Sequence, residues 1–250
     1  MPVLETRGLD KHFGGIIAAN QVSLSIEKGA RHALIGPNGA GKTTIVNLLT
    51  GVIKPTAGQI LLDGEDITQL EPHERVRLGI ARTFQINQLF RGLTVLENVY
   101  LAVAERVGAA HRLWRPAGAE REVIDQALAQ LESLRLADDA LRLVRELPYG
   151  RQRLVEIAIA LAQHPRVLLL DEPAAGVPSS ESHLILDVIG ALDPDIAILI
   201  IEHDMDVVFR FAARITVLVA GAVLTEGTPH EIRADARVRA VYLGEEFPHG

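Results

Sequence analysis

The segment from Gly36 to Thr44 combines residue types that bind phosphate groups. It fits the pattern G-x-x-x-x-G-K-[ST], in which glycines let successive backbone N–H groups point inward around phosphate oxygens. The lysine of this pattern, Lys42, reaches the β- and γ-phosphates, and the hydroxyl of Thr43 ligates Mg²⁺. The segment predicts a site for a nucleoside triphosphate. We expect the nucleotide to contact Gly36, Pro37, Asn38, Gly39, Ala40, Gly41, Lys42, Thr43 and Thr44.

Two acidic residues follow an apolar run farther along the chain. The run 167–170 reads Val-Leu-Leu-Leu, and Asp171 and Glu172 come directly after it. A carboxylate at the C-terminal end of a parallel strand lies where open α/β sheets bind their ligands. We therefore expect Asp171 to hold Mg²⁺, usually through water, and Glu172 to polarise the attacking water as a general base. The alternative is a solvated acidic turn after a core strand.

Alternating patterns predict the elements that position these residues. A strand is expected at 33–35, before the glycine-rich segment, and a helix at 45–49 after it. Residues 3–35 alternate short apolar stretches with turns, which is typical of an antiparallel β portion, and 58–68 continue it. The continuous apolar runs 167–170 and 196–201 predict parallel strands that are buried on both faces.

Helical spacing dominates the middle of the chain. Between about Thr94 and Leu147, apolar residues recur four apart at Val95, Val99 and Val103. A second apolar face is expected at Ile124, Leu128 and Leu131, and a further helix from Arg153 to Gln163. Near the C-terminus, 214–227 predict a hairpin that turns at Gly221.

Composition narrows the class of protein. The chain has 250 residues, 48% of them hydrophobic, a formal net charge of −7 and no cysteine. This favours one large α/β domain, excludes disulfides and cysteine-based zinc sites, and offers no general attraction to nucleic acid. The first residues do not form a signal peptide, and the longest apolar runs are far shorter than the roughly 20 residues of a membrane helix. A membrane role is therefore expected only through partner proteins.

The order of these motifs resembles that of ABC transporter ATPase subunits over nearly the whole chain. The resemblance rests on the glycine-rich segment 36–44, Gln85, the segment 147–153 (Leu-Pro-Tyr-Gly-Arg-Gln-Arg), Asp171-Glu172-Pro173 and His203. The chain is most similar to the ATPases of branched-chain amino-acid uptake systems. That closer likeness is carried by Phe13-Gly14-Gly15, Leu147 to Gly150, Leu154 to Ala158, Asp171 to Gly176, Ile201 to Met205 and Tyr242 to Glu245.

The resemblance implies an α/β P-loop fold with a parallel sheet, an antiparallel β subdomain and an inserted helical lobe. We expect one domain over 1–250, with the core and β subdomain at 1–85 and 166–250 and the lobe at 86–165. It implies further site residues. Phe13 stacks on adenine, Gln85 touches Mg²⁺ and the attacking water, and His203 contacts the γ-phosphate. The alternatives are a core phenylalanine, a surface glutamine and a structural histidine.

The segment around Gly150 is implied to serve a second subunit. In this family two ATPase subunits pair head to tail, and Tyr149, Gly150 and Arg151 would face the ATP of the partner. Two departures from the subgroup stand out. Arg151 replaces the usual glutamine, which places an additional cation near a triphosphate, and Val-Pro-Ser at 177–179 replaces Leu-Asn-Pro. Both departures concern communication between subunits, so a heterodimer with a second ATPase is expected in preference to a homodimer.

The function expected from the resemblance is ATP hydrolysis that powers an importer. Its cofactors are ATP and Mg²⁺, and its partners are permease subunits, a second ATPase and, indirectly, a solute-binding protein. The chain would lie on the cytoplasmic face of the inner membrane as a peripheral protein. Branched-chain amino acids are the expected cargo, with urea, amides or small carboxylates as alternatives. Two other functions stay open: a soluble ABC ATPase acting on ribosomes or DNA, and an ATP-binding regulatory module with little turnover.

Overall fold

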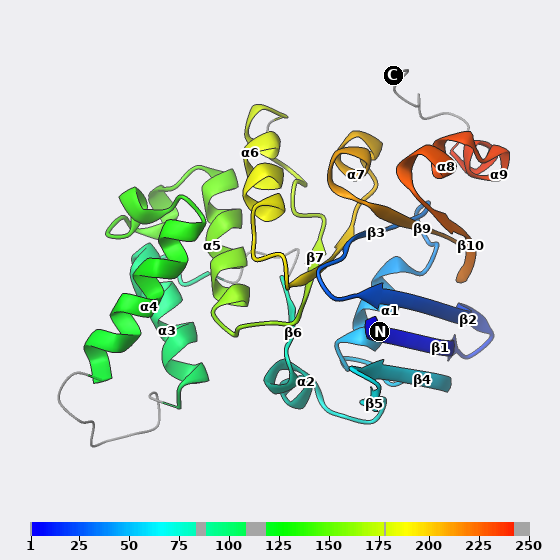
Figure 1. The fold of residues 1–250 in the computed structure, drawn as a ribbon, viewed down its shortest axis with the longest axis horizontal. Helices are drawn as coiled ribbons and strands as arrows, with labels where there is room; N and C mark the ends of the chain where they lie inside the picture. The colour runs from blue at the N-terminus through cyan, green and yellow to red at the C-terminus, as the bar shows by residue number, and fades with distance from the viewer. Residues whose placement is uncertain (1, 84–88, 109–118, 178, 243–250) are drawn as a thin grey trace. The chain divides into compact units, whose positions relative to one another are not determined.

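The computed structural model describes residues 2–83, 89–108, 119–177 and 179–242. They form two compact units (Figure 1). The core unit comprises Met1–Ile80, Arg166–Glu172 and Asp193–Gly250, and the helical unit comprises Ala81–Pro165 and Pro173–Leu192. The expected arrangement of one domain with a lobe at 86–165 stays a prediction.

An antiparallel sheet forms the N-terminal part of the core unit. Its strands lie in the order β2 (Ile16–Glu27), β1 (Pro2–Phe13), β4 (Ala57–Leu62) and β5 (Glu65–Asp66). The predicted antiparallel portion is therefore confirmed for the strands on either side of the glycine-rich segment. The prediction was wrong for the last five residues of 3–35, which belong to a second sheet.

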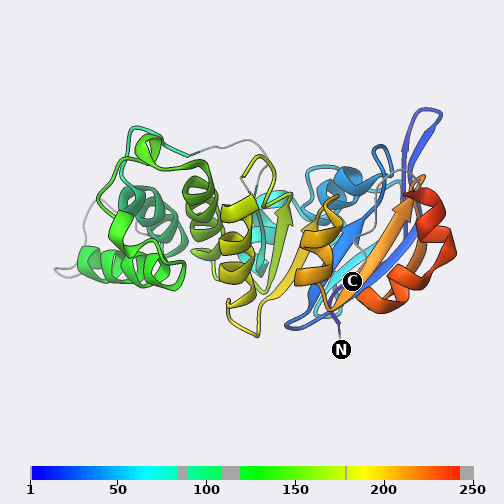
Figure 2. The same cartoon turned by 90° about the horizontal axis from the view of Figure 1, so that it is seen from above.

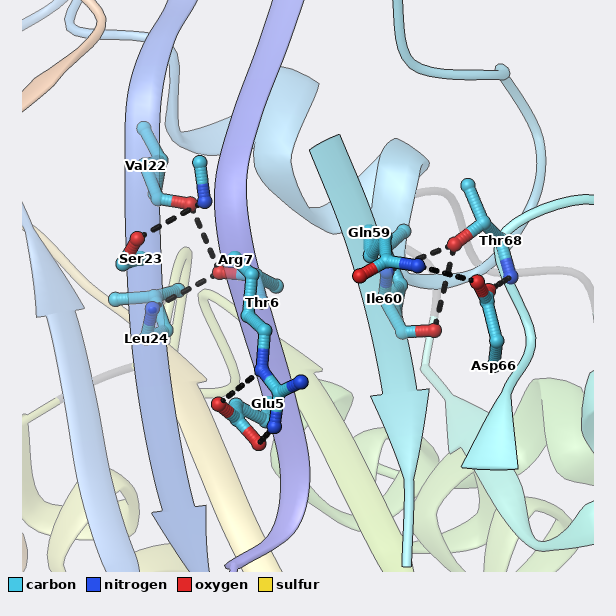
Figure 3. Close-up of polar contacts among 11 residues, drawn as sticks. Glu5, Thr6, Arg7, Val22, Ser23, Leu24, Gln59, Ile60, Asp66 and Thr68 are labelled. Atoms are coloured by element: carbon cyan, nitrogen blue, oxygen red, sulfur yellow. Dashed lines mark hydrogen bonds and ion pairs between the residues drawn. The ribbon is translucent and has the colours of Figure 1, made fainter. Parts of the chain in front are cut away.

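Side-chain hydroxyls form hydrogen bonds with backbone groups where the strand pairing of this antiparallel sheet is irregular (Figure 3). The pairing of β1 with β2 shifts register after Thr6. There the buried Thr6 hydroxyl donates to the carbonyl of Val22 at 3.0 Å and accepts from the N–H of Leu24 at 2.9 Å. Because buried backbone groups need partners, this hydroxyl replaces ladder bonds that the shifted register removes.

The second sheet of the core unit is mainly parallel. Its strands lie in the order β10 (Ala222–Gly227), β9 (Arg214–Val219), β3 (Arg31–Ile35), β8 (Ala197–Ile201), β7 (Val167–Asp171) and β6 (Ile80–Arg82). Every residue of β7 and β8 is buried, as their continuous apolar runs predicted. The predicted hairpin is also confirmed, because β9 and β10 pair antiparallel around Gly221.

Short helices complete the core unit. The helix α1 (Lys42–Leu49) follows β3, and α7 (Met205–Phe211) begins at an Asp204 side chain that accepts two backbone N–H groups. The C-terminal helices α8 (Pro229–Ala234) and α9 (Ala236–Val241) lie beside β10 (Figure 2). None of the described helices is both long and apolar enough to span a bilayer.

The helix α2 (Pro72–Leu78) is tied to α1 by a buried arginine. The guanidinium of Arg75 donates to the carbonyls of Leu48 and Leu49 at 2.6 and 2.9 Å. It also donates to the carbonyls of Thr68 and Leu70. The last carbonyls of α1 lack helical donors, so Arg75 serves as a C-terminal cap supplied by a distant residue. The strand β6 (Ile80–Arg82) follows this helix.

Among the residues that the structure describes, the helical unit contains four α-helices and two 3₁₀ turns, at Ala137–Asp139 and Val144–Glu146. The capping box of Thr94 with Glu97 starts the first helix, whose predicted apolar face at Val95, Val99 and Val103 is buried. The α-helices are α3 (Val95–Arg106), α4 (Ala119–Ser133), α5 (Tyr149–Leu161) and α6 (Ser179–Gly190).

The buried face of α4 differs from the predicted one. Val123, Ala127 and Leu131 are buried, whereas Leu128 is 39% exposed and Ile124 is only half-buried. Residues four apart share a helix face, so the set of Val123, Ala127 and Leu131 forms one stripe. The prediction overlooked Ala127 because alanine gives a weak hydrophobic signal. It started the stripe one residue too late.

Candidate functional site

The glycine-rich segment 36–41 joins β3 to α1, and Lys42 is the first residue of the helix. Gly41 has φ of +100°, and a Cβ atom there would lie 2.4 Å from the carbonyl oxygen of Ala18 on β2. A Cβ at Gly36 would lie 2.2 Å from the carbonyl oxygen of Leu218 on β9. Only glycine fits these two positions, because β2 and β9 pack directly against the loop.

Backbone hydrogen bonds join the loop to the turn at Gly221 and to β2. The N–H of Gly221 donates to Ala40 O at 2.9 Å, and the N–H of Asn20 donates to Gly221 O at 2.8 Å. The first N–H groups of an α-helix have no acceptor within the helix. In α1 these belong to Lys42, Thr43 and Thr44, and together with the positive end of the helix dipole they are suited to bind anionic oxygens.

Lys42 folds back over the loop. Its Nζ donates to the carbonyls of Gly36 at 2.6 Å and Pro37 at 3.1 Å. Burial lowers the pKa of Lys42 below its ordinary value of 10.5, while the charges of Glu172 and Asp171 oppose this shift. These carboxylates favour the charged ammonium, and charged N–H donors of this kind form strong hydrogen bonds with phosphate oxygens.

The two predicted acids lie at the end of β7. Asp171 is buried as the last residue of that strand. Glu172 follows with φ of +46°, and its N–H donates to Ile201 O of β8 at 2.9 Å. A positive φ costs energy for a residue with a side chain, and such strain concentrates at functional sites.

His203 lies close to Glu172 because it follows β8, the strand that pairs with β7. β8 ends at Ile201, two residues earlier, and Nδ1 of His203 lies 3.3 Å from Oε1 of Glu172. The His203 side chain is 60% exposed, so it is not a core histidine. A carboxylate and an imidazole within reach of each other are suited to orient a water molecule and a phosphate oxygen.

Phe13 lies at the end of β1 and is 49% exposed, which excludes the core position that was its alternative. One face of its ring is covered by Lys11, whose Nζ lies 5.1 Å from the ring centre. The same Nζ donates to Lys54 O at 2.7 Å. Lys11 thus fixes the ring by a cation–π contact. Lys11 was not predicted as a site residue, although residues two apart on a strand share a face.

The segment expected to face a second subunit starts α5. Pro148 is the N-cap, Tyr149 is 39% exposed, and Gly150 is buried within the first turn. The guanidinium of Arg151 donates to the carboxylate of Asp139 at 2.9 Å, although the side chain is 35% exposed. Gln85 and Pro178 lie outside the described residues.

The donor set around the loop fits Mg²⁺. This ion prefers hard oxygen ligands and keeps several waters, so it is held by one or two protein oxygens plus substrate phosphates. The Thr43 hydroxyl at the start of α1 and the carboxylate of Asp171 supply such oxygens. No cluster of three acidic, histidine or cysteine ligands occurs among the described residues, and an ion shared with a triphosphate needs none.

Comparison with known proteins identifies the family of the chain. Residues 19–175 match the family described as ABC transporter, and 222–248 match the branched-chain amino acid ATP-binding cassette transporter family. The protein BraF of Pseudomonas aeruginosa, a high-affinity branched-chain amino acid transport ATP-binding protein, is 42% identical over 98% of both chains. LivG of Escherichia coli, with the same description, is 41% identical over the same shares.

Solved structures agree in fold. The ADP conformation of MJ1267, an ATP-binding cassette of an ABC transporter, superposes with a TM-score of 0.85 at 34% identity. It covers 98% of this chain and 100% of its own. The dimeric cassette MJ0796 superposes with a TM-score of 0.75 at 28% identity, over 90% and 98% of the two chains. The chain belongs to the ABC transporter family, as an ATP-binding cassette whose ATP hydrolysis is coupled to transport.

Proposed function

We propose that this cassette powers the uptake of branched-chain amino acids through separate permease subunits. The observation that carries the proposal is likeness over the full length to two branched-chain transport ATPases, at 42% and 41% identity. The C-terminal match at 222–248 supports it independently, because it covers a segment outside the ATP-binding motifs. The urea, amide and small-carboxylate alternatives have no comparable support.

Within this function, the core unit binds and cleaves its own ATP. Lys42 and the N–H groups at the start of α1 bind the triphosphate, and Phe13 stacks on adenine. Thr43 and Asp171, with Gln85, hold Mg²⁺, which when bound neutralises charge on the phosphates. Glu172 takes a proton from the attacking water.

His203 positions the γ-phosphate beside Glu172, which its Nδ1 approaches to 3.3 Å. Tyr149, Gly150 and Arg151 contribute to the ATP site of a partner cassette, as paired cassettes such as dimeric MJ0796 would allow. Closure of two cassettes around ATP, and reopening after hydrolysis, would then move the permease gate. We propose that the cassette docks on its permeases at the cytoplasmic face of the membrane, beside a second ATPase chain and served by a solute-binding protein.

Uptake in cells that lack the gene tests the cargo. Restoring the wild-type chain should restore uptake of labelled leucine, isoleucine and valine, whereas Lys42→Ala should not, because the triphosphate loses its cation. Lys28→Ala is the matched control, because Lys28 pairs with Asp195 on the surface. Uptake of urea, an amide or a small carboxylate that depends on the chain, with unchanged leucine uptake, would contradict the proposal.

A further inference from the structure

Arg151 joins the start of α5 to a turn that lies earlier in the helical unit. Its Nη1 donates to Oδ2 of Asp139 at 2.9 Å and to the carbonyl oxygen of Arg135 at 2.7 Å. The Asp139 carboxylate is only 9% exposed, and its other oxygen accepts from Nη1 of Arg142 at 2.8 Å. One nearly buried carboxylate therefore binds two guanidinium groups, of which only that of Arg151 belongs to α5.

The turn that supplies these acceptors has its own fixed geometry. Arg135 has φ of +56°, and the 3₁₀ helix Ala137–Asp139 begins two residues later, after its N-cap Leu136. The carbonyl of Arg135 and the carboxylate of Asp139 converge on the same nitrogen of Arg151. The two residues of this contact are 12 positions apart in sequence. The contact joins the first turn of α5 to the 3₁₀ helix that follows α4.

A cation in the first turn of a helix is unfavourable, because the helix dipole is positive at that end. The Asp139 carboxylate offsets this charge with a charge-assisted hydrogen bond in a poorly solvated place, where such bonds are strong. Without the Asp139 carboxylate, Arg151 would keep its charge at the positive helix end, and of its acceptors among the described residues only the carbonyl of Arg135 would remain.

We propose that Asp139 is a positioning residue for the ATP-dependent pairing of cassettes. Its hydrogen bond to Arg151 fixes the first turn of α5, Tyr149 to Arg151. In that orientation the turn can contact the nucleotide bound to a partner cassette. This role rests on the proposed function, in which that turn faces the ATP of a second cassette. We call the contact of Arg151 with Asp139 the clamp. In it, the Asp139 carboxylate neutralises the charge of Arg151 before any nucleotide binds.

Four variants of the full chain test the clamp: Asp139→Asn, Arg151→Gln, their combination, and Arg142→Gln. Arg142→Gln is the matched control, because it removes the other guanidinium from Asp139 without touching α5. The rate of ATP hydrolysis per chain is measured as a function of protein concentration, and ATP affinity is measured separately. Hydrogen exchange of the first amides of α5 is followed on the same samples.

Asp139→Asn should raise the protein concentration for half-maximal turnover by about tenfold, the change for one charge-assisted bond worth ~1.4 kcal/mol. The affinity for ATP and the KM should not change, and amide exchange at the start of α5 should accelerate. In the Arg151→Gln background the same substitution should change the half-maximal concentration by less than about twofold, because no cation is left to release.

An equal loss in both backgrounds, or the same loss in Arg142→Gln, would overturn the clamp, because Asp139 would then act independently of Arg151. No effect of Asp139→Asn on either turnover or exchange would also overturn it. If the wild-type chain binds ATP but does not hydrolyse it, the exchange data still decide whether Asp139 holds α5. A wild-type chain that does not bind ATP contradicts the proposed function, not the clamp.

Discussion

Glu172 combines a strained backbone with a carboxylate close to His203, and this combination predicts a general base. Glu172→Gln should leave the affinity for ATP nearly unchanged, because Lys42 and the loop N–H groups remain. Turnover should fall by about 10²-fold or more, the range for loss of a general base. Equilibrium nucleotide binding and steady-state hydrolysis, measured on the same preparation, check both statements.

The same variant should accumulate as an ATP-bound dimer, because binding continues when hydrolysis stops. Size-exclusion chromatography with Mg-ATP would show this species, and ADP should not produce it. If Glu172→Gln instead loses nucleotide affinity, the residue supports the fold of the loop after β7 and is not the base.

The exposed ring of Phe13 predicts a contact with the base of the nucleotide. Phe13→Ala should weaken ATP binding by about tenfold, the scale of one lost stacking contact. Affinity for inorganic triphosphate, which has no base, should stay the same. Ile17→Ala is a suitable control, because Ile17 is 52% exposed on the same hairpin and has no aromatic ring. Equal losses for both ligands would assign Phe13 to the fold.

Residues of the glycine-rich segment could be predicted because their chemistry depends on neighbours in sequence. Lys42 contacts Gly36 and Pro37, only six and five positions away. The partners of Arg151 and Arg75 could not be predicted in this way. Asp139 lies 12 residues from Arg151, and Leu48 lies 27 residues from Arg75, so each contact exists only once the chain has folded. No short pattern indicates such pairs.

At the scale of elements, Arg75 joins the C-terminal end of α1 to α2. Arg75→Met should lower the melting temperature strongly, because the carbonyls of Leu48, Leu49 and Thr68 lose a charged donor, and among the described residues Leu48 keeps only the N–H of Gly51. Hydrogen bonds to charged groups contribute about 1.5–3 kcal/mol each, so we expect a loss of at least ~3 kcal/mol. Arg77→Met is the matched control on the exposed side of the same helix. Similar melting temperatures for the two variants would contradict this role.

A buried histidine links the strands β3, β9 and β10. Nε2 of His32 lies 2.8 Å from the hydroxyl of Thr216, which donates to Glu226 at 2.7 Å. The hydroxyl therefore accepts from His32, whose Nε2 carries the proton. Burial lowers the pKa of His32 below its ordinary value of 6.5; Glu226 opposes this shift and Arg214 adds to it.

The lowered pKa of His32 makes stability depend on pH. The unfolded chain binds the proton near pH 6.5, whereas the folded chain binds it only at lower pH. Stability should therefore be full above about pH 6.5 and decline by up to ~1.4 kcal/mol per pH unit below it, until the folded pKa is reached. Thermal melts between pH 5 and 7 should show a shallower decline for His32→Gln. The exposed His12→Gln should keep the wild-type slope.

Strands were easier to predict from the sequence than helix faces. The buried strands β7 and β8 give unbroken apolar runs, and their placement in a parallel sheet follows from burial on both faces. The stripe of α4 depends on Ala127, whose small side chain carries little hydrophobic signal. β3 was assigned to the wrong sheet because three apolar residues before a loop do not reveal which strands will flank them.

At the scale of the whole molecule, the sequence predicts a regular site for this cassette's own nucleotide and an unusual segment for a partner. From the resemblance, we expect the glycine-rich segment 36–44, Glu172 and His203 to follow the family pattern, and the family match at 19–175 covers the first two. Arg151 departs from it, and in this structure the departure is accommodated by Asp139. The segment 177–179 also departs. In a homodimer both ATP sites would contain these departures, whereas in a heterodimer one site would receive an ordinary segment from the second chain.

We therefore expect this chain to hydrolyse ATP faster beside a different ATPase chain than beside its own copies. Because pairing follows mass action, the rate per chain should rise with concentration for the isolated cassette. At equal concentration, the complex with permeases and a second ATPase should be at least about tenfold faster, which corresponds to ~1.4 kcal/mol of additional pairing or activation free energy. If the isolated cassette reaches the rate of the complex, and that rate does not depend on concentration, its own copies suffice and the heterodimer is not required.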